Sequence, residues 1–281
     1  IISETIQPSS VNHTLSLNAG TGGTVSGGGS YGYGTSANIT ATPNAGYSFS
    51  GWSGAGVTDT DAASTTVSMT ADRSVSASFT LNNHTLSLSA GTGGTVSGGG
   101  SYGYGTNANI TATAYTGYTF SGWSGVGVTD TDAASTTVSM TADRSVTASF
   151  TLNTHTLSVT AGTGGSVSGG GNYGYGTSAN ITATADTGYT FSGWSGSGVT
   201  DTDAAITTVS MTADRSVSAS FTLNNHTLSL SAGTGGSVSG GGNYGYGTSA
   251  NITATANTGY TFSGWSGEGV TDTDVASTTV S

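Results

Sequence analysis

Residues 76–91 read SASFTLNNHTLSLSAG, and this stretch indicates how the whole chain is built. On both sides of Asn82 and Asn83, apolar residues alternate with serine and threonine, which is the pattern of β-strands with one buried face. Two predicted strands therefore follow each other with only two residues between them. The spacing of the rest of the chain indicates that the first strand closes one domain and the second strand opens the next.

The chain is a tandem repeat. Its four tryptophans recur every 71 residues, and so do its four histidines. This period divides the chain into a leader at 1–12, complete units at 13–83, 84–154 and 155–225, and an incomplete unit at 226–281. A fixed period of this kind is typical of arrays in which each repeat is one small structural unit.

Each unit is predicted to be a small all-β domain. No stretch has the apolar spacing of an amphipathic helix, and glycine-rich turns separate the alternating segments. The two-residue junctions are too short to act as flexible linkers, so we expect a rod-like tandem array of β-sheet domains. In the second unit the predicted strands are HTLSLSA (84–90), ANITATA (108–114), YTFSGW (118–123), TTVSMTA (136–142) and RSVTASFTL (144–152).

The composition excludes several classes of protein. Charged residues make up 6% of the 281 residues, the formal net charge is −11, and the only basic residues besides histidine are three arginines. Such a chain cannot neutralise a nucleic-acid backbone, so we expect no nucleic-acid partner. The chain has no cysteine for a disulfide framework. It also has no apolar run long enough to span a bilayer, so we expect no direct membrane insertion.

No catalytic site is predicted. The segment GWSGA (51–55) superficially resembles the nucleophile motif G-x-S-x-G, but its fifth position is Ala55, Val126, Ser197 or Glu268 in the four units and never glycine. The single histidine of each unit lies at the start of the unit, close to the junction. We therefore expect a non-enzymatic protein that needs no cofactor.

Paired aspartates are the best metal candidates. The segment TDTDAA can supply two carboxylates and several carbonyl oxygens to calcium, which prefers six to eight oxygen ligands. No third acidic residue lies nearby in sequence, and Asp also stabilises turns by bonding to its own backbone. The calcium and turn hypotheses both stay open for Asp59, Asp61, Asp130, Asp132, Asp201, Asp203, Asp272 and Asp274.

Two tyrosines separated by one glycine form a second candidate site. In an extended segment the two rings lie on one face, where they either pack on the core or against a neighbouring unit, or are exposed together as a platform for a sugar. Both hypotheses apply to the pairs Tyr31/Tyr33, Tyr102/Tyr104, Tyr173/Tyr175 and Tyr244/Tyr246. The string GYSFSGW (46–52) instead indicates buried core residues, so we expect core positions for Trp52, Trp123, Trp194 and Trp265.

The segment 23–79 resembles the divergent internalin-type B-repeat of bacterial secreted and surface proteins. The shared pattern has a Gly-Thr-Val opening, Tyr and Gly before a Thr/Ala-rich strand, the string Gly-Tyr-x-Phe-x-Gly-Trp, and a closing strand with Val and Phe. The resemblance implies an extracellular module, usually in tandem, that spaces or presents other parts and has no catalytic activity. The residues that match are Gly46, Tyr47, Phe49, Gly51, Trp52, Val75 and Phe79, with their equivalents in the second and third units.

We therefore predict a structural extracellular protein, in a stalk or fibre, that sets length and spacing at the cell surface. Two alternatives remain open. A glycan-binding adhesin would use the tyrosine pairs, and a calcium-stiffened surface module would use the aspartate pairs.

The fourth unit lacks the closing segment that reads MTADRSVSASFTLNN at 69–83. We expect it to be completed either by further repeats into which the chain continues, end to end, or by self-association through β-strand addition from another subunit. The leader IISETIQPSSV is a candidate donor because Ile2 and Ile6 share a face. Glu4 interrupts this face and Pro8 limits pairing, so the leader is the second hypothesis.

Overall fold

The computed structural model describes residues 11–281. The chain divides into two compact units, residues 1–151 and 152–281, with the boundary near the end of the second repeat. Every regular element among the described residues is a β-strand. The predicted tandem array of small all-β domains is therefore confirmed, whereas its rod-like arrangement stays a prediction.

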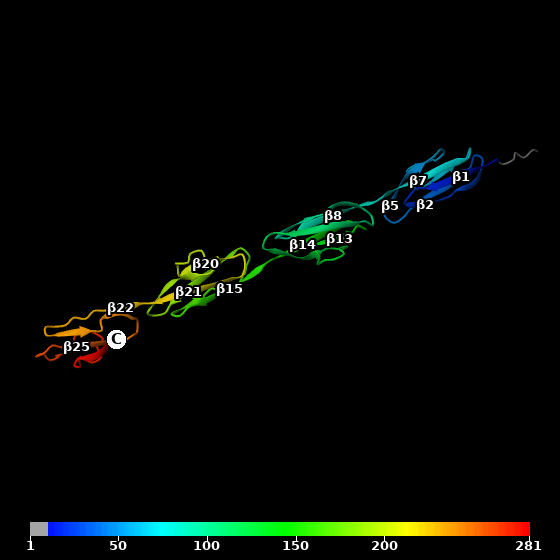
Figure 1. The fold of residues 1–281 in the computed structure, drawn as a ribbon. Helices are drawn as coiled ribbons and strands as arrows, with labels where there is room; N and C mark the ends of the chain where they lie inside the picture. The colour runs from blue at the N-terminus through cyan, green and yellow to red at the C-terminus, as the bar shows by residue number, and fades with distance from the viewer. Residues whose placement is uncertain (1–10) are drawn as a thin grey trace, which may run out of the picture. The chain divides into compact units, whose positions relative to one another are not determined.

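The first repeat is a sandwich of two sheets (Figure 1). The four-stranded sheet has the order β3-β1-β7-β5 and the three-stranded sheet the order β2-β4-β6. At the centre of the larger sheet β1 and β7 run parallel, and β7 also pairs antiparallel with β5. The strands are β1 (Asn12–Ala19), β2 (Gly23–Ser26), β3 (Gly29–Gly32), β4 (Ser36–Pro43), β5 (Tyr47–Ser53), β6 (Ser64–Ser68) and β7 (Arg73–Leu81).

The second and third repeats have the same two sheets. The second repeat contains β8 (Asn83–Ala90), β9 (Gly94–Ser97), β10 (Gly100–Gly103), β11 (Asn107–Ala114), β12 (Tyr118–Ser124), β13 (Ser135–Ser139) and β14 (Arg144–Leu152). The third repeat contains β15 (Thr154–Ala161), β16 (Gly165–Ser168), β17 (Gly171–Gly174), β18 (Thr177–Ala185), β19 (Tyr189–Ser195), β20 (Ile206–Met211) and β21 (Arg215–Leu223). The 71-residue sequence period is thus a period of the structure.

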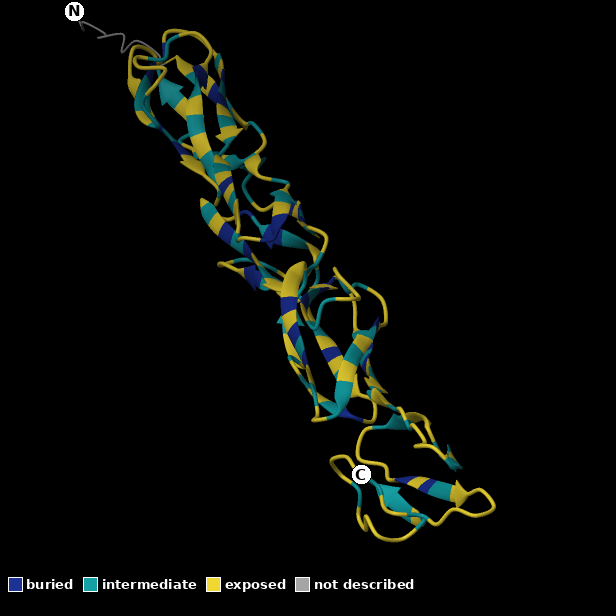
Figure 2. Cartoon of the chain, turned by 90° about the vertical axis from the view of Figure 1, so that its left-hand side faces the viewer, coloured by how far each residue is buried: buried dark blue, intermediate teal, exposed yellow. Residues whose placement is uncertain are grey.

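Apolar side chains between the two sheets form the core of each complete repeat. Buried and exposed residues alternate along the strands, as the period-2 pattern predicts (Figure 2). Ala37 and Ala41 lie on the same face of β4 as Ile39 and are buried with it. In the first repeat the buried cluster is Leu15, Ala37, Ile39, Ala41, Trp52, Val67, Met69, Val75 and Ala77.

The fourth repeat has no counterpart of the closing strands β7, β14 and β21 within the described residues. Its first strand is four residues long, whereas β1 has eight, and residues 260–266 are not in a strand although the equivalent residues form β5. Both segments lose their regular structure because the strand that joins them is missing. The strands are β22 (Asn225–Leu228), β23 (Gly236–Ser239), β24 (Gly242–Gly245), β25 (Ala250–Ala256) and β26 (Ser277–Val280).

Trp265 consequently differs from its three equivalents. Trp52, Trp123 and Trp194 are 4–5% exposed, whereas Trp265 is only half-buried. The expectation of a core position for Trp265 is therefore wrong for this repeat, because the closing strand that covers the other indoles is missing. In the fourth repeat, Ala250 and Ile252 are the buried apolar residues.

Two sequence expectations concern the ends and the surroundings of the chain. The strand-donor hypothesis for the leader falls almost entirely on residues 1–10, which lie outside the described residues. Within residues 11–281, the structure contains no helix of the length and apolarity that crossing a membrane requires.

Candidate functional site

The segment TDTDAA wraps around the core tryptophan. The indole Nε1–H of Trp52 donates to the Ala62 carbonyl at 3.1 Å, and the Trp52 backbone N–H donates to the Thr60 carbonyl at 2.7 Å. Asp59 shapes the loop that carries these carbonyls, because its Oδ1 accepts from the backbone N–H groups of Asp61 and Ala62 at 2.9 and 3.2 Å. The first aspartate thus performs the turn role considered from the sequence.

The same loop geometry recurs at Asp130, Asp201 and Asp272. The second aspartate of the pair, such as Asp61, is exposed. Among residues 11–281 no three His, Asp or Glu side chains lie together as a potential metal site. Calcium binding by these loops stays a prediction, and its oxygen ligands would include an Oδ1 atom that already accepts two hydrogen bonds.

The two tyrosines of the first pair have different environments. The Tyr31 hydroxyl donates to the Gly27 carbonyl at 2.7 Å, and its ring packs on the core cluster. Tyr33 follows the last residue of β3, is 66% exposed, and lies 5.9 Å from the His13 ring. In this pair one ring packs on the core and the other is exposed, so the two rings are neither both packed nor both exposed.

The third repeat has the corresponding contacts at Tyr173 and Tyr175. Tyr173 packs on the core cluster and donates its hydroxyl to the Gly169 carbonyl at 2.7 Å. Tyr175 follows the last residue of β17, is partly buried, and lies 6.0 Å from the His155 ring. Its backbone N–H donates to the Asn153 carbonyl at 2.8 Å. Both rings of this pair are partly buried.

The tyrosine pairs of the second and fourth repeats have the corresponding contacts. The first tyrosine of each pair donates its hydroxyl to a glycine carbonyl at 2.6–2.7 Å. The second tyrosine follows the last residue of β10 or β24, and its ring lies 6.0 or 6.1 Å from the histidine ring of its own repeat. Both rings of the pair Tyr102/Tyr104 are partly buried, whereas in the pair Tyr244/Tyr246 only Tyr244 is partly buried and Tyr246 is 46% exposed.

Tyr104, the second tyrosine of the second repeat, lies at a junction between domains. Its ring occupies the space beside Gly46, so that a side chain at Gly46 would collide with it. Gly46 also has a φ of 80°, which disfavours other residues. Tyr104 is partly buried, whereas the equivalent Tyr33 is exposed.

Asn82 is the only residue between β7 and β8, so the junction is one residue shorter than the sequence predicted. Its backbone N–H donates to the Gly46 carbonyl at 2.7 Å, and its carbonyl accepts from the Tyr104 N–H at 2.8 Å. Its side-chain Oδ1 accepts from the Ser48 hydroxyl at 2.6 Å. One residue therefore bonds to both the repeat that precedes it and the repeat that follows it.

The junction between the third and fourth repeats has the same bonds. The Asn224 N–H donates to the Gly188 carbonyl, and the Asn224 carbonyl accepts from the Tyr246 N–H, both at 2.8 Å. The Tyr246 ring lies against Gly188, as Tyr104 does against Gly46. The arrangement is consequently a property of the repeat and occurs in both compact units.

A histidine and an aspartate connect the two ends of each complete repeat. Asp72 Oδ1 accepts from the Thr14 backbone N–H at 2.8 Å and lies 3.4 Å from His13 Nδ1. The hydrogen bond from Thr14, with a smaller contribution from His13, lowers the pKa of Asp72, and Thr156 and His155 do the same for Asp214. The single histidine of each complete repeat thus lies beside an aspartate of the same repeat.

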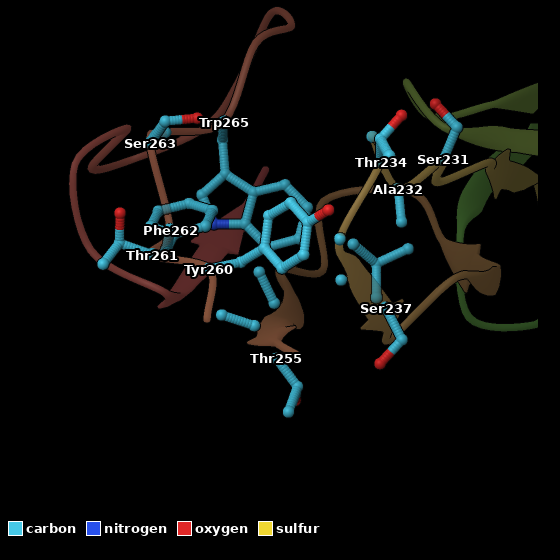
Figure 3. A pocket seen from close by; sticks show the side chains of 17 residues that line it. Ser231, Ala232, Thr234, Ser237, Thr255, Tyr260, Thr261, Phe262, Ser263 and Trp265 are labelled. Carbon is cyan, nitrogen blue, oxygen red and sulfur yellow. The ribbon is translucent and has the colours of Figure 1, made fainter. Parts of the chain in front are cut away.

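A groove replaces the closing strand in the fourth repeat (Figure 3). Figure 3 shows the rings of Tyr260, Phe262 and Trp265 gathered on one side of it and Thr234 and Ser237 on the other. Tyr260 is 55% exposed, whereas the equivalent Tyr47 is partly buried.

Small two-sheet domains joined through one hydrogen-bonded residue define the class as a tandem β-domain repeat protein. A family model for the divergent InlB B-repeat domain matches residues 13–83, 84–154, 155–225 and 226–281. The chain belongs to this family, which confirms the resemblance derived from the sequence. No curated protein matches the chain.

Proposed function

We propose that this chain is a structural protein of the cell exterior, whose repeats form a stalk or fibre that sets length and spacing between the parts it joins. Its membership of the B-repeat family supports a surface location and a non-enzymatic role. The low charge and the surface rich in Ser, Thr and Gly are compatible with this role.

The observation that carries the proposal is the bonding of the junction residue. Asn82 and Asn224 each bond through the backbone to the repeats on both sides, and a glycine–tyrosine contact closes around each of them. A junction with these contacts resists reorientation of the neighbouring domains, whereas a flexible linker does not. A passive spacer needs this property, and a binding module does not.

The two alternative functions have weaker support. Two observations weaken the glycan-binding hypothesis. The first tyrosine of each pair already bonds to a backbone carbonyl, and Tyr104 and Tyr246 lie against glycines of the preceding repeat. The calcium hypothesis is weakened because Asp59 already accepts two backbone hydrogen bonds within its own loop. Neither arrangement leaves a complete set of residues free for a ligand.

The stiffness of the junction can be measured directly. Because the chain has no cysteine, Ser26→Cys and Ser97→Cys introduce two unique labels at equivalent exposed positions of the first two repeats. We expect spin labels at these sites to give one narrow distance distribution, and insertion of Gly-Ser-Gly-Ser between Asn82 and Asn83 to broaden it. Equal breadth with and without the insertion would contradict the spacer function.

The cellular location needs a separate measurement. We expect antibodies against the repeats to label intact cells of the source organism, and electron microscopy to find the label on surface or released fibres. Label confined to the cell interior would rule out the proposed location and leave the stiffness result unaffected.

A further inference from the structure

In each complete repeat, the first strand and the closing strand are hydrogen-bonded to each other. In the first repeat these strands are β1 and β7, which run parallel from Leu15/Arg73 to Ala19/Ala77 (Figure 1). The second and third repeats have the same parallel pairing, of β8 with β14 and of β15 with β21. The strand through which the chain enters a repeat is therefore joined directly to the strand through which it leaves.

Further hydrogen bonds close this parallel pair at both of its ends. Asp72 Oδ1 accepts from the Thr14 N–H at 2.8 Å, just before the first paired residues. The Gly20 N–H donates to the Ala77 carbonyl at 2.9 Å, just after the last paired residues. Equivalent bonds occur at both ends of the pair in the second and third repeats. The two strands are thus fastened over the whole length of their contact.

The core of the repeat covers one face of the pair. Leu15, Val75 and Ala77 are at most 2% exposed and belong to the core cluster between the two sheets. Water can therefore reach the hydrogen bonds between the strands only from the outer face, and a backbone group that loses its partner away from water is costly. On the outer face of the second repeat, the hydroxyls of Ser89 and Thr147 lie 2.6 Å apart and join the two strands again.

The parallel direction of the pair decides how tension along the array acts on it. Covalent continuity applies tension to a repeat at the start of its first strand and at the end of its closing strand. Because the two strands are parallel, these points lie at opposite ends of the pair, and tension slides one strand along the other. All hydrogen bonds of the pair then carry the load together, whereas strands that are pulled apart from one end separate bond by bond.

The other strands of the repeat lie between these two strands in the covalent chain. Residues 20–72 connect β1 to β7 and contain β2 to β6, including the whole of the smaller sheet. Tension along the chain extends this segment only after β1 and β7 have separated. The parallel pair consequently protects the rest of the repeat from the load.

We propose that the complete repeats bear tension, and that the parallel pair of first and closing strands is the element that resists it. This role goes beyond the spacer function, because a spacer that sets length need not withstand force. An array of such repeats keeps its length until a pair separates. Each separation then releases the 71 residues of one repeat, which extend to about 230–260 Å, less the distance between the ends of the folded repeat.

Pulling the first repeat from two different pairs of points within the chain 1–281 tests the proposal. The chain has no cysteine, so cysteines introduced at exposed residues are unique attachment points for the DNA handles of optical tweezers. Asn12→Cys with Ser78→Cys loads opposite ends of the β1/β7 pair, and Asn12→Cys with Ala71→Cys loads the two ends that lie together. The first variant should unfold at no less than about twice the force of the second, because five residue pairs share the load at once. Equal forces in the two variants would overturn the proposal.

Matched valine substitutions separate resistance to force from ordinary stability. Each complete repeat has one valine in its closing strand and one in its smaller sheet that are at most 1% exposed. Replacing either set by alanine removes the same atoms from the core and should lower stability in urea by similar amounts. The closing-strand set is Val75, Val146 and Val217, and the smaller-sheet set is Val67, Val138 and Val209.

The two sets are compared by pulling the chain 1–281 through its ends, which should give three extension steps of equal length, one for each complete repeat. The closing-strand set should lower the mean force of these steps, and the smaller-sheet set should leave it unchanged. An equal loss of force in both sets would show that overall stability, and not the parallel pair, resists the tension. If either set fails to fold, the two-point pulling of the first repeat still decides. A negative result in these force measurements leaves the spacer function standing, because the spin-label distances are measured without load.

Discussion

Asp72 joins the start of β1 to the loop before β7, two segments 58 residues apart in sequence. Its carboxylate accepts the Thr14 N–H next to His13, at the point where the parallel pair β1/β7 begins. Asp143 and Asp214 make the same bond in the second and third repeats. At the scale of single residues, an exposed carboxylate thus fixes where the closing strand starts.

The lowered pKa of Asp72 predicts how acid affects the first repeat. A carboxyl group whose pKa is lower in the folded state stabilises that state fully above its ordinary pKa of about 4, and this contribution disappears as the pH falls through the lower, folded value. Asp72→Asn, which cannot ionise, should therefore make the loss of stability below about pH 4 shallower. Urea unfolding followed by the methyl NMR signals of Val75 from pH 2 to 7 measures this.

Asp61→Asn is the control for that experiment. It also removes one exposed carboxylate from the first repeat but leaves the hydrogen bond from Thr14 in place. An identical change of the acid profile in both variants would contradict the role given to Asp72.

The junction and the closing strand together show how the elements cooperate. The closing strand completes the larger sheet of its own repeat, and the next residue, Asn82, bonds to the β4–β5 turn and to the residue after β10. Since only that residue separates β7 from β8, formation of the junction depends on formation of both neighbouring sheets. We expect the first two repeats to lose their junction contacts when either repeat unfolds.

Gly46 and Gly34 provide a matched test of the junction. Both have a φ near 80°, but a side chain at Gly46 would collide with Tyr104, whereas a side chain at Gly34 has open space around it. Gly34→Ala should cost only the backbone strain of about 1 kcal/mol. Gly46→Ala should carry a similar strain and should also displace Tyr104 and speed exchange of the Asn82 amide. Equal exchange in the two variants would show that the ring contact does not hold the junction.

At the scale of the whole molecule, the repeats differ in completeness. The first three each have a core cluster between two sheets, and the fourth lacks the strand that carries Val, Ala, Phe and Leu. Burial of a large apolar side chain contributes roughly 1.5–3 kcal/mol, so three missing ones represent much of the stability of a small domain.

The fourth repeat should therefore unfold first. We expect the amides of Ile252 and its neighbours in β25 to exchange faster than those of Ile110 and Ile181, the equivalent residues of complete repeats. Repeating residues 211–225 directly after Ser281 should slow that exchange to the level of the complete repeats. Equal protection of all three isoleucines in the unmodified chain would show that the closing strand is not required for stability.

The sequence alone determined the repeat period, five of the seven strands of a complete repeat and most of the core, but it missed the two short strands equivalent to β9 and β10, which lie in glycine-rich segments predicted to be turns. These properties are local, since the 71-residue spacing and the alternation of apolar and polar residues can be read within one unit. The Asp59 turn was likewise among the sequence hypotheses, because its bonds reach only two and three residues along the chain. The same local pattern did not predict that Tyr31 packs on the core while Tyr33 is exposed.

Only the tertiary structure decided which residues meet across long separations. The parallel pairing of β1 with β7, the bond from Thr14 to Asp72 and the packing of Tyr104 on Gly46 join segments 58 residues apart. The alternation of residue types along one strand does not predict such contacts, because they depend on how the two sheets of a repeat pack together and on where one repeat ends and the next begins. The groove beside Trp265 is a further example, because Ser231 and Tyr260 line it from separate parts of the fourth repeat and only the fold brings them together.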